Sequence, residues 1–239
     1  MPRIKHGRLT PVTVVVSFLG FLTILTVVSV RPARGPLGID SAWNAVMTSS
    51  NTSAFVEVAK VLNIFGGPIV SGLVLPAILL LVLLVGRRYW ATLFVILVCV
   101  GRGVAVFVVK VLVDRPRPDG GLVSVHSESF PSGHSASAAV IVLMLVLIFS
   151  SQRWLPYFGG VYVLSMMWSR TYLHVHWLTD TIAGALLGLV VALAVWMVLR
   201  ERVAQESQSG MRGTGNSSSS KKVSEGADRL EVSDKRLCE

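Results

Sequence analysis

Long apolar runs separated by short polar segments dominate the sequence. A transmembrane helix needs roughly 20 apolar residues to cross about 30 Å of hydrocarbon, and six runs approach that length. Some of them are shorter, which helix tilt or local thinning of the bilayer accommodates. The pattern predicts an all-α membrane protein with six transmembrane helices in a bundle and both termini on one side. The six runs are residues 12–30, 69–86, 91–109, 134–150, 154–169 and 178–199.

The first apolar run follows several basic residues, as the hydrophobic region of a signal peptide does. It is longer than such a region usually is, and no clear small-residue cleavage site follows it. We therefore expect this run to be retained as the first helix of the bundle.

Two polar segments stand apart from the apolar runs. In the loop after the first run, the stretch Ala42–Ile64 spaces its apolar residues as a helix does, which predicts one or two helices lying along the membrane interface. The chain beyond Arg202 is rich in Ser, Gly, Lys, Asp and Glu, a composition too polar to bury a core. We expect a six-span domain over residues 1–202 and a disordered cytoplasmic tail over residues 203–239.

The composition agrees with a membrane protein. Hydrophobic residues make up 52% of the chain and charged residues 15%, whereas about 25% of a soluble domain is charged. The formal net charge of +9 suits loops that face anionic lipid headgroups. No run of Lys and Arg is interleaved with aromatic residues, which argues against a nucleic-acid partner. Cys99 lies in an apolar run and Cys238 in the tail, which argues against a disulfide.

Ionisable residues gather at the ends of predicted spans in three segments, residues 110–118, 130–134 and 169–180. The alternation of the spans places all three segments on the same side of the membrane. Ionisable groups beside or within spans are costly, so they indicate a functional site.

Three cations and one helix start in these segments suit a phosphoryl group. Arg117 and Arg170 present planar forks that match phosphate oxygens, and Lys110 adds a point charge. The run Pro131-Ser132-Gly133 opens a helix whose first backbone N–H groups are free to bind an anion. Gly133 also allows the backbone to approach a ligand closely. The sequence therefore predicts a binding site for phosphate at this face.

Two histidines and an aspartate supply the chemistry. His176 and Asp180 are four residues apart and share a face if a helix begins near His176. A carboxylate bonded to one ring nitrogen fixes the tautomer and leaves the other nitrogen as a nucleophile. His134 can protonate the leaving oxygen and later activate water. We therefore expect phosphoryl transfer through a phosphohistidine at His176, without a cofactor.

The same segments resemble the signature of the type 2 phosphatidic acid phosphatase superfamily, which is K-x6-R-P, then P-S-G-H, then S-R-x5-H-x3-D. The resemblance implies a metal-independent hydrolase built on six helices, with the site near the outer membrane face. It implies that His176 is the nucleophile, Asp180 its partner and His134 the acid. It also implies that phosphate is bound by Lys110, Arg117, Ser132, Gly133 and Arg170. The matching residues are Lys110…Arg117-Pro118, Pro131-Ser132-Gly133-His134 and Ser169-Arg170…His176…Asp180.

Other polar residues near the three segments have simpler interpretations. His174 and His176 form an H-x-H pair, but no carboxylate or cysteine completes a metal-ligand set nearby. Arg115 begins a second Arg-Pro pair at the wrong distance from Lys110, so we expect it at the rim of the site. Arg102 lies inside the third span, where it snorkels to the interface or pairs with a buried carboxylate.

Three functions are compatible with these residues. The first is hydrolysis of a lipid phosphomonoester or diphosphate, such as phosphatidic acid, phosphatidylglycerol phosphate or undecaprenyl diphosphate. The second is a lipid phosphotransferase with an acceptor other than water, and the third is a non-enzymatic lipid or ion transporter. A complete set of nucleophile, orienting carboxylate and acid favours an enzyme over a transporter. Six spans argue against a soluble vanadate haloperoxidase with the same signature.

The membrane orientation follows from the basic residues in the loops. If Lys110, Arg117 and Arg170 belong to a substrate site, the remaining Lys and Arg residues favour cytoplasmic termini. We expect a plasma-membrane protein whose site faces the extracytoplasmic side and whose partners are its lipid phosphate substrate and membrane lipids. The sequence indicates neither the identity of that lipid nor an oligomeric state.

Overall fold

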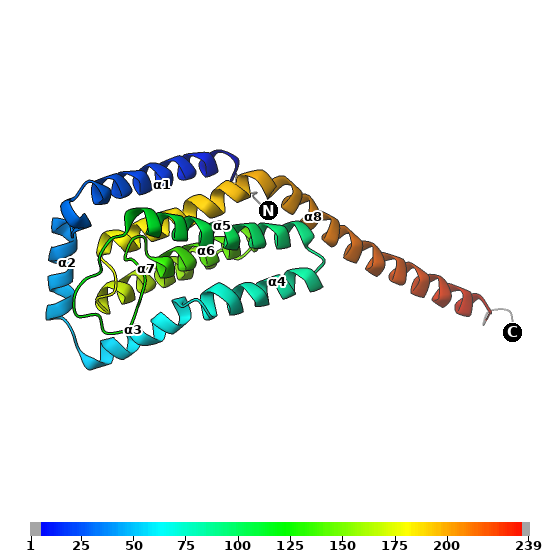
Figure 1. Ribbon diagram of the computed structural model, residues 1–239. Helices are drawn as coiled ribbons and strands as arrows, with labels where there is room; N and C mark the ends of the chain where they lie inside the picture. The colour runs from blue at the N-terminus through cyan, green and yellow to red at the C-terminus, as the bar shows by residue number, and fades with distance from the viewer. Residues whose placement is uncertain (1–5, 236–239) are drawn as a thin grey trace. The chain divides into compact units, whose positions relative to one another are not determined.

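The computed structural model describes the backbone of residues 6–235 and the side chains of residues 11–207. These residues form helices, turns and loops, and no strand occurs among them. The chain divides into two compact units, of which the first ends at Val198 and contains every predicted site residue. The elements are α1 (His6–Ser29), η1 (Pro32–Arg34), α2 (Gly38–Ser49), α3 (Ser53–Gly66), η2 (Val70–Val74), α4 (Leu75–Val85), α5 (Tyr89–Val113), α6 (Gly133–Ile148), α7 (Leu155–Tyr172) and α8 (Leu178–Lys235) (Figure 1).

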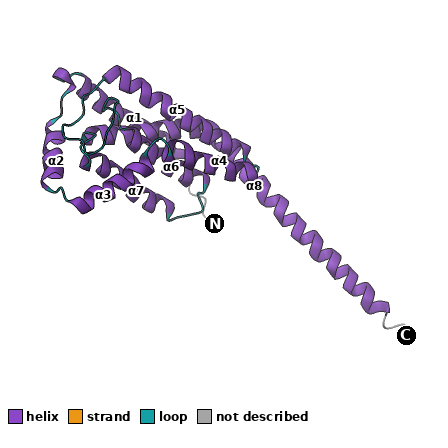
Figure 2. Cartoon of the chain, turned by 60° about the horizontal axis from the view of Figure 1, so that its bottom comes forward, coloured by secondary structure: helices purple, strands orange, loops and turns teal. Residues whose placement is uncertain are grey.

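Helices account for all six predicted apolar runs, and Figure 2 shows that loops only connect them. Among the described residues, four helical segments are long and apolar enough to cross a membrane. α6 is a shorter apolar helix, and α7 covers the fifth predicted run. The helical, multi-span character is thus confirmed, whereas the count of six spans stays a prediction. The four long segments are Pro11–Ser29, Ser53–Val85, Tyr89–Val113 and Leu178–Ser207.

The loop after the first span contains the two expected helices, α2 and α3, and α3 ends at Gly66, directly before the second predicted span. A short turn with an extended Gly67 separates α3 from the π-helical turn η2, which leads directly into α4 (Figure 1). Pro68 has no backbone N–H and cannot extend a regular helix. The Ser71 hydroxyl compensates, because it donates to the carbonyls of Gly66 at 2.8 Å and Gly67 at 2.9 Å. This turn therefore joins α3 to the membrane helix that follows it.

Two glycines allow α8 to pack closely on the start of α6. A Cβ at Gly184 would lie 2.3 Å from the carbonyl oxygen of Ser132, and one at Gly188 would lie 2.6 Å from that of Ala136. The glycines are four residues apart and therefore lie on one helical face. Close approach through small residues is a common way for membrane helices to associate. The contact brings the backbone of Asp180 to Ser132, whose N–H donates to the Asp180 carbonyl at 3.0 Å.

An apolar core lies between the helices that carry the site. It combines side chains from α1, α5, α6 and α8 with one residue of the loop before α6. This packing fixes the ends of helices that are distant in sequence. Its buried members are Phe21, Val28, Val106, Val113, Phe130, Ala136, Ala183 and Leu187.

The second unit begins at Leu199 and continues α8 as far as Lys235. Its side chains are described only up to Ser207, so the residues whose polarity led us to expect disorder lie largely outside the described side chains. The disordered cytoplasmic tail over residues 203–239 stays a prediction.

Candidate active site

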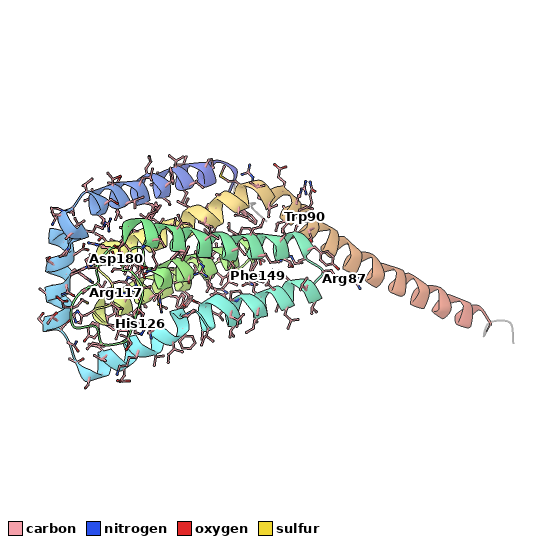
Figure 3. All side chains as sticks on the ribbon, viewed as in Figure 1. Arg87, Trp90, Arg117, His126, Phe149 and Asp180 are labelled. Carbon is pink, nitrogen blue, oxygen red and sulfur yellow. The ribbon has the colours of Figure 1, made fainter. Side chains whose placement is uncertain are left out.

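The predicted site residues converge at one end of the first unit. Figure 3 shows Arg117 and Asp180 at the end where α2 lies, whereas Arg87 and Trp90 lie at the opposite end. Each of four helix ends and two loops supplies part of the site. The contributions are Lys110 near the end of α5, Arg117 in the loop before α6, Ser132, Gly133 and His134 at the start of α6, Arg170 near the end of α7, His176 in the following turn, and Asp180 at the start of α8.

The His176–Asp180 pair is buried at the start of α8. His176 is 4% exposed and Asp180 is fully buried. The distance from His176 Nδ1 to Asp180 Oδ2 is 3.6 Å, which is an ion-pair distance and longer than a good hydrogen bond. Asp180 Oδ2 also accepts hydrogen bonds from the Trp177 N–H at 2.9 Å and from the Ser129 hydroxyl. The carboxylate is therefore held in position beside the imidazole.

The other ring nitrogen of His176 faces a cation. Its Nε2 lies 3.3 Å from Arg117 Nη1, and a guanidinium can only donate. The Arg117 side chain also donates to the carbonyls of Ser127 at 2.7 Å, Glu128 at 3.0 Å and Val175. Donation by Arg117 on one side and a carboxylate on the other favour the tautomer with its proton on Nδ1. The lone pair of Nε2 is then directed toward the cations.

The three predicted phosphate-binding cations keep their charge free of close carboxylates. Lys110 donates to the carbonyl of Glu128, and Arg170 donates to the side-chain oxygen of Asn63. No ion pair within 4.0 Å among the described residues includes Lys110, Arg117 or Arg170. Three formal positive charges thus surround the His176 ring, and their present partners are neutral oxygens. Such a cluster attracts an anion with several oxygens.

This surrounding lowers the pKa of His176 well below its ordinary value of 6.5. Burial is the main cause, because it disfavours the charged imidazolium, and the nearby Arg117, Arg170 and Lys110 act in the same direction. A lower pKa keeps the imidazole neutral in mildly acidic solution. A neutral imidazole has the free lone pair that a nucleophile requires.

The start of α6 supplies polar groups to the same space. Ser132 is fully buried at the N-cap of α6, and its hydroxyl accepts a 3.4 Å hydrogen bond from the Ser135 N–H. Gly133 and His134 are the first two residues of the helix, whose N–H groups have no partner within the helix. The Nε2 atom of His134 is buried without a hydrogen-bond partner among the described residues. Free N–H groups and an imidazole nitrogen without a partner thus lie at one helix start.

α3 forms a wall of the site that the sequence analysis missed. Asn63 accepts the hydrogen bond from Arg170, which is 1% exposed. A Cβ at Gly66 would lie 2.7 Å from His134 Cδ2 and 2.5 Å from Met166 Sδ, so only glycine fits there without displacement. The apolar spacing of α3 predicted an interfacial helix and gave no signal for contacts with residues more than 60 positions away.

Arg115 was predicted at the rim, and that prediction is wrong. Its side chain is fully buried and forms ion pairs with Asp40 on α2, at 2.7 Å, and with Asp180. Asp40 was not among the predicted site residues. Burial of this arginine is possible because two carboxylates and several carbonyl oxygens satisfy its donors.

Two further expectations can be compared with the structure. Arg102 donates to the Ser137 hydroxyl at 2.6 Å, instead of to a buried carboxylate. His174 is 6% exposed, and its Nδ1 lies 2.8 Å from the side-chain oxygen of Asn44. Among the described residues, no cluster of three or more His, Cys, Asp or Glu side chains with metal-binding geometry occurs.

The chain is similar to two curated bacterial proteins. Over 118 residues the chain is 36% identical to phosphatidylglycerophosphatase B of Bacillus subtilis (strain 168). The matched region covers 46% of this chain and 58% of that protein. Over 88 residues it is 30% identical to YbjG of Escherichia coli (strain K12), provisionally named an undecaprenyl-diphosphatase, covering 36% of this chain and 43% of that protein. The chain thus spans about half the length of these curated relatives.

Two solved structures share the fold. The crystal structure of the first transmembrane PAP2 type phosphatidylglycerolphosphate phosphatase from Bacillus subtilis has a TM-score of 0.69 and 28% identity, covering 79% of this chain and 96% of that chain. Aquifex aeolicus LpxE, with a TM-score of 0.59 and 20% identity, covers 67% of this chain and 96% of that chain and supports the fold alone. Multiple apolar helices and a transmembrane neighbour identify a multi-pass membrane protein. Residues 88–204, which contain the whole set of motifs, match the model of the PAP2 superfamily.

Proposed function

We propose that this protein is a lipid phosphatase that hydrolyses a lipid phosphomonoester or diphosphate through a phosphohistidine intermediate, without a metal. The observation that carries the proposal is the position of His176. Its Nδ1 faces Asp180 at 3.6 Å, and its Nε2 faces the Arg117 guanidinium at 3.3 Å. An oriented nucleophile inside a cluster of cations suits phosphoryl transfer, in which positioning and charge stabilisation provide most of the catalysis.

In the first step, His176 Nε2 attacks phosphorus and forms the N–P bond while the bond from phosphorus to the leaving oxygen breaks. Lys110, Arg117 and Arg170 hold the non-bridging oxygens, together with the N–H groups at the start of α6. His134 gives a proton to the departing oxygen, so that an alcohol leaves from a monoester and a lipid monophosphate leaves from a diphosphate. The Asp180 carboxylate stabilises the positive charge that develops on the His176 ring.

In the second step, water attacks the phosphohistidine. His134 is now neutral and accepts a proton from that water, so the N–P bond breaks, inorganic phosphate forms and His176 returns to its starting state. Retention of the N–H proton on Nδ1 by Asp180 prevents the ring from changing tautomer between the two steps. No redox or cofactor chemistry enters this sequence.

The names of two relatives and the apolar helices of the chain support a proposal for the substrate class. One relative is named for phosphatidylglycerophosphate and another for undecaprenyl diphosphate. Both substrates combine a terminal phosphate with a long apolar chain, and we propose this combination for the present protein. The chain spans only part of those relatives, so the choice between a glycerophospholipid and an isoprenoid is left to experiment.

We also propose that the six apolar helical runs span the plasma membrane, with α2 and the start of α3 at the interface. The site then lies on the extracytoplasmic side and both termini in the cytoplasm. The support is the position of Arg87 at the end of the unit opposite to Arg117 and Asp180, because basic loops favour the cytoplasmic side.

The proposal can be tested with purified protein in detergent micelles. The experiment measures inorganic phosphate released from phosphatidic acid, phosphatidylglycerol phosphate and undecaprenyl diphosphate, each with and without EDTA. We expect release from at least one lipid, undiminished by EDTA and abolished in His176→Ala. The matched control is His126→Ala, which changes an exposed histidine of the same loop region and should retain activity. Loss of activity in EDTA, or a fully active His176→Ala protein, would contradict the proposal.

A further inference from the structure

A buried network of charged residues lies behind the His176–Asp180 pair. It consists of Asp40 on α2, Arg115 after α5 and Asp180 on α8, and their side chains are fully buried. Arg115 lies 75 positions after Asp40 and 65 positions before Asp180 in the sequence. The proposed reaction has no direct use for Asp40 or Arg115, so their burial calls for a separate explanation.

The guanidinium of Arg115 joins the two carboxylates. Its Nη2 donates to Asp40 Oδ2 at 2.7 Å, and its Nη1 donates to Asp180 Oδ1 and to the Thr179 hydroxyl at 2.9 Å. Its Nε and Nη2 are also within 3.3 Å of the carbonyls of Arg34 and Gly35. A planar fork with this many acceptors has little freedom to rotate. Arg115 therefore fixes the orientation of Asp180.

Asp40 has a second connection to α8. Its Oδ1 accepts the backbone N–H of Thr179 at 2.9 Å, and its Oδ2 accepts the Thr179 hydroxyl at 2.9 Å. Thr179 directly precedes Asp180 in the first turn of α8. Asp40 also accepts the N–H of Leu37 at 3.0 Å, which anchors it to the start of its own helix. α2 is thereby fastened to the helix turn that carries the carboxylate partner of His176.

The charges of the network do not cancel. Two carboxylates and one guanidinium leave one formal negative charge, and Arg115, the one Lys or Arg among the described residues that lies within 4.0 Å of the Asp180 carboxylate, is shared with Asp40. A carboxylate paired with an arginine of its own would be largely neutralised, whereas one that shares the arginine keeps negative potential toward a neighbour. That neighbour is His176, at 3.6 Å.

We propose that Asp40 acts through Arg115 as a positioning residue, which keeps Asp180 both correctly oriented and sufficiently negative to support His176 as a nucleophile. This inference rests on the proposed function and extends it to residues outside the family's motif. The Asp40 carboxylate prevents Arg115 from neutralising Asp180, and Arg115 prevents the two carboxylates from repelling each other.

Other charged and titratable groups also act on His176, and they remain unchanged in the test below. They come from every element around the ring. They are Lys110 on α5, Arg117 in the loop before α6, His134 on α6, Arg170 on α7 and Asp180 on α8.

The test compares Asp40→Asn, Arg115→Gln and the double variant with the wild-type protein, using kcat and kcat/KM for a short-chain lipid phosphate across pH. Asp40→Asn removes a negative charge, so the acid limb should move to lower pH by about one unit and kcat should fall about 10-fold with little change in KM. Arg115→Gln removes a positive charge and should move the limb to higher pH. The double variant restores the net charge of the network, so its limb should return toward the wild-type position.

A merely structural role predicts a different result. Loss of folded protein lowers kcat in all three variants without moving the acid limb, and the double variant is then the least active. If the acid limb of the pH profile lies at the same pH in all variants, the inference is overturned. The proposed function stays intact in that case, provided that phosphate release by the wild type depends on His176. If His176→Ala retained full activity, the proposed function would fail first. Unfolding curves in the same detergent identify any variant that is not folded under assay conditions. For such a variant Asp40→Glu provides the test, because it keeps the negative charge and should keep the acid limb of the wild-type pH profile.

Discussion

Arg115 and Arg117 are separated by a single proline, yet their surroundings differ in kind. Arg115 is 1% exposed and bonded to two carboxylates, Asp40 and Asp180. Arg117 is partly exposed, donates to backbone carbonyls and faces His176 Nε2 at 3.3 Å. Two identical side chains in one Arg-Pro-Arg-Pro run thus have different tasks. The first holds the structure of the site together, and the second is available to a ligand.

The difference lies in the acceptors. A carboxylate forms a strong, charge-assisted bond that a ligand cannot easily replace, and removal of one partner from such a buried pair leaves an uncompensated charge. A carbonyl oxygen forms a weaker bond, so a phosphate oxygen can take its place with a gain in free energy. The acceptors of an arginine therefore indicate whether its charge belongs to the fold or to the substrate.

The largest effect is expected for Arg117→Gln. Removing one charged donor from a phosphoryl-transfer site should lower kcat/KM about 10³-fold. The pKa of His176 should also rise, because the Arg117 cation is one cause of its low value. Protonation then inactivates the nucleophile at higher pH, so the acid limb of the pH profile should move upward. Steady-state phosphate release across pH measures both effects, and unchanged kcat/KM would remove Arg117 from the site.

The next effect is on stability and concerns the other arginine. Arg115→Ala leaves two buried carboxylates without their cation, which should lower the free energy of unfolding by about 3–5 kcal/mol. Arg117→Ala is the matched control and should change stability little, because it removes a cation that lies among other cations. Denaturant unfolding in micelles measures both values. Equal stability losses for the two variants would contradict the division of tasks.

A smaller effect is expected for Gly66→Ala. The new methyl group would meet His134 Cδ2 and Met166 Sδ at less than normal contact distance, so His134 must shift. Overpacking of this kind costs about 1–3 kcal/mol, and we expect kcat to fall about 10-fold. Gly72→Ala is the control, since a Cβ at Gly72 has no atom within 4 Å. If both variants keep wild-type kcat, the placement of His134 against α3 is not critical.

The smallest effect is expected for the exposed ion pair next to the site. Arg34 and Asp114 are 3.2 Å apart, with side chains 40% and 72% exposed. Solvent screens such a pair, so Asp114→Asn should change stability by no more than about 0.5 kcal/mol and leave kcat unchanged. The unfolding and phosphate-release assays above measure it. A large loss of stability or of kcat would mean that the solvent-exposed Asp114 contributes to the site as much as the buried Asp40.

The sequence predicted the parts of the site that lie within short motifs. The spacing placed Lys110 and Arg117 in one short segment and His176 and Asp180 in another, and the structure brings Arg117 and Asp180 to the two ring nitrogens of His176. The helices were predicted equally well from the apolar runs, because an apolar run of this length has few alternatives to a helix in a membrane.

The sequence did not predict the contacts between distant segments. Arg170 bonds to Asn63 across 107 positions, and Arg115 bonds to Asp40 across 75. The neighbouring sequence does not mark Asn63 or Asp40 as the polar partner of a buried charge. Asp40 is a single aspartate in α2 and Asn63 a single asparagine in α3, and neither belongs to a recognisable motif. Position relative to Lys110 alone made Arg115 look peripheral, whereas its burial depends on where α2 packs.

The central claim is that His176 becomes covalently phosphorylated inside the cluster of cations. The direct measurement is mass spectrometry of the protein after brief incubation with a lipid phosphate and an alkaline quench, which preserves phosphohistidine. We predict one phosphoryl group on the peptide that contains His176, absent in His176→Ala. A phosphoryl group on another residue, or a protein that releases phosphate with no trapped adduct on His176 at any time point, would contradict the account.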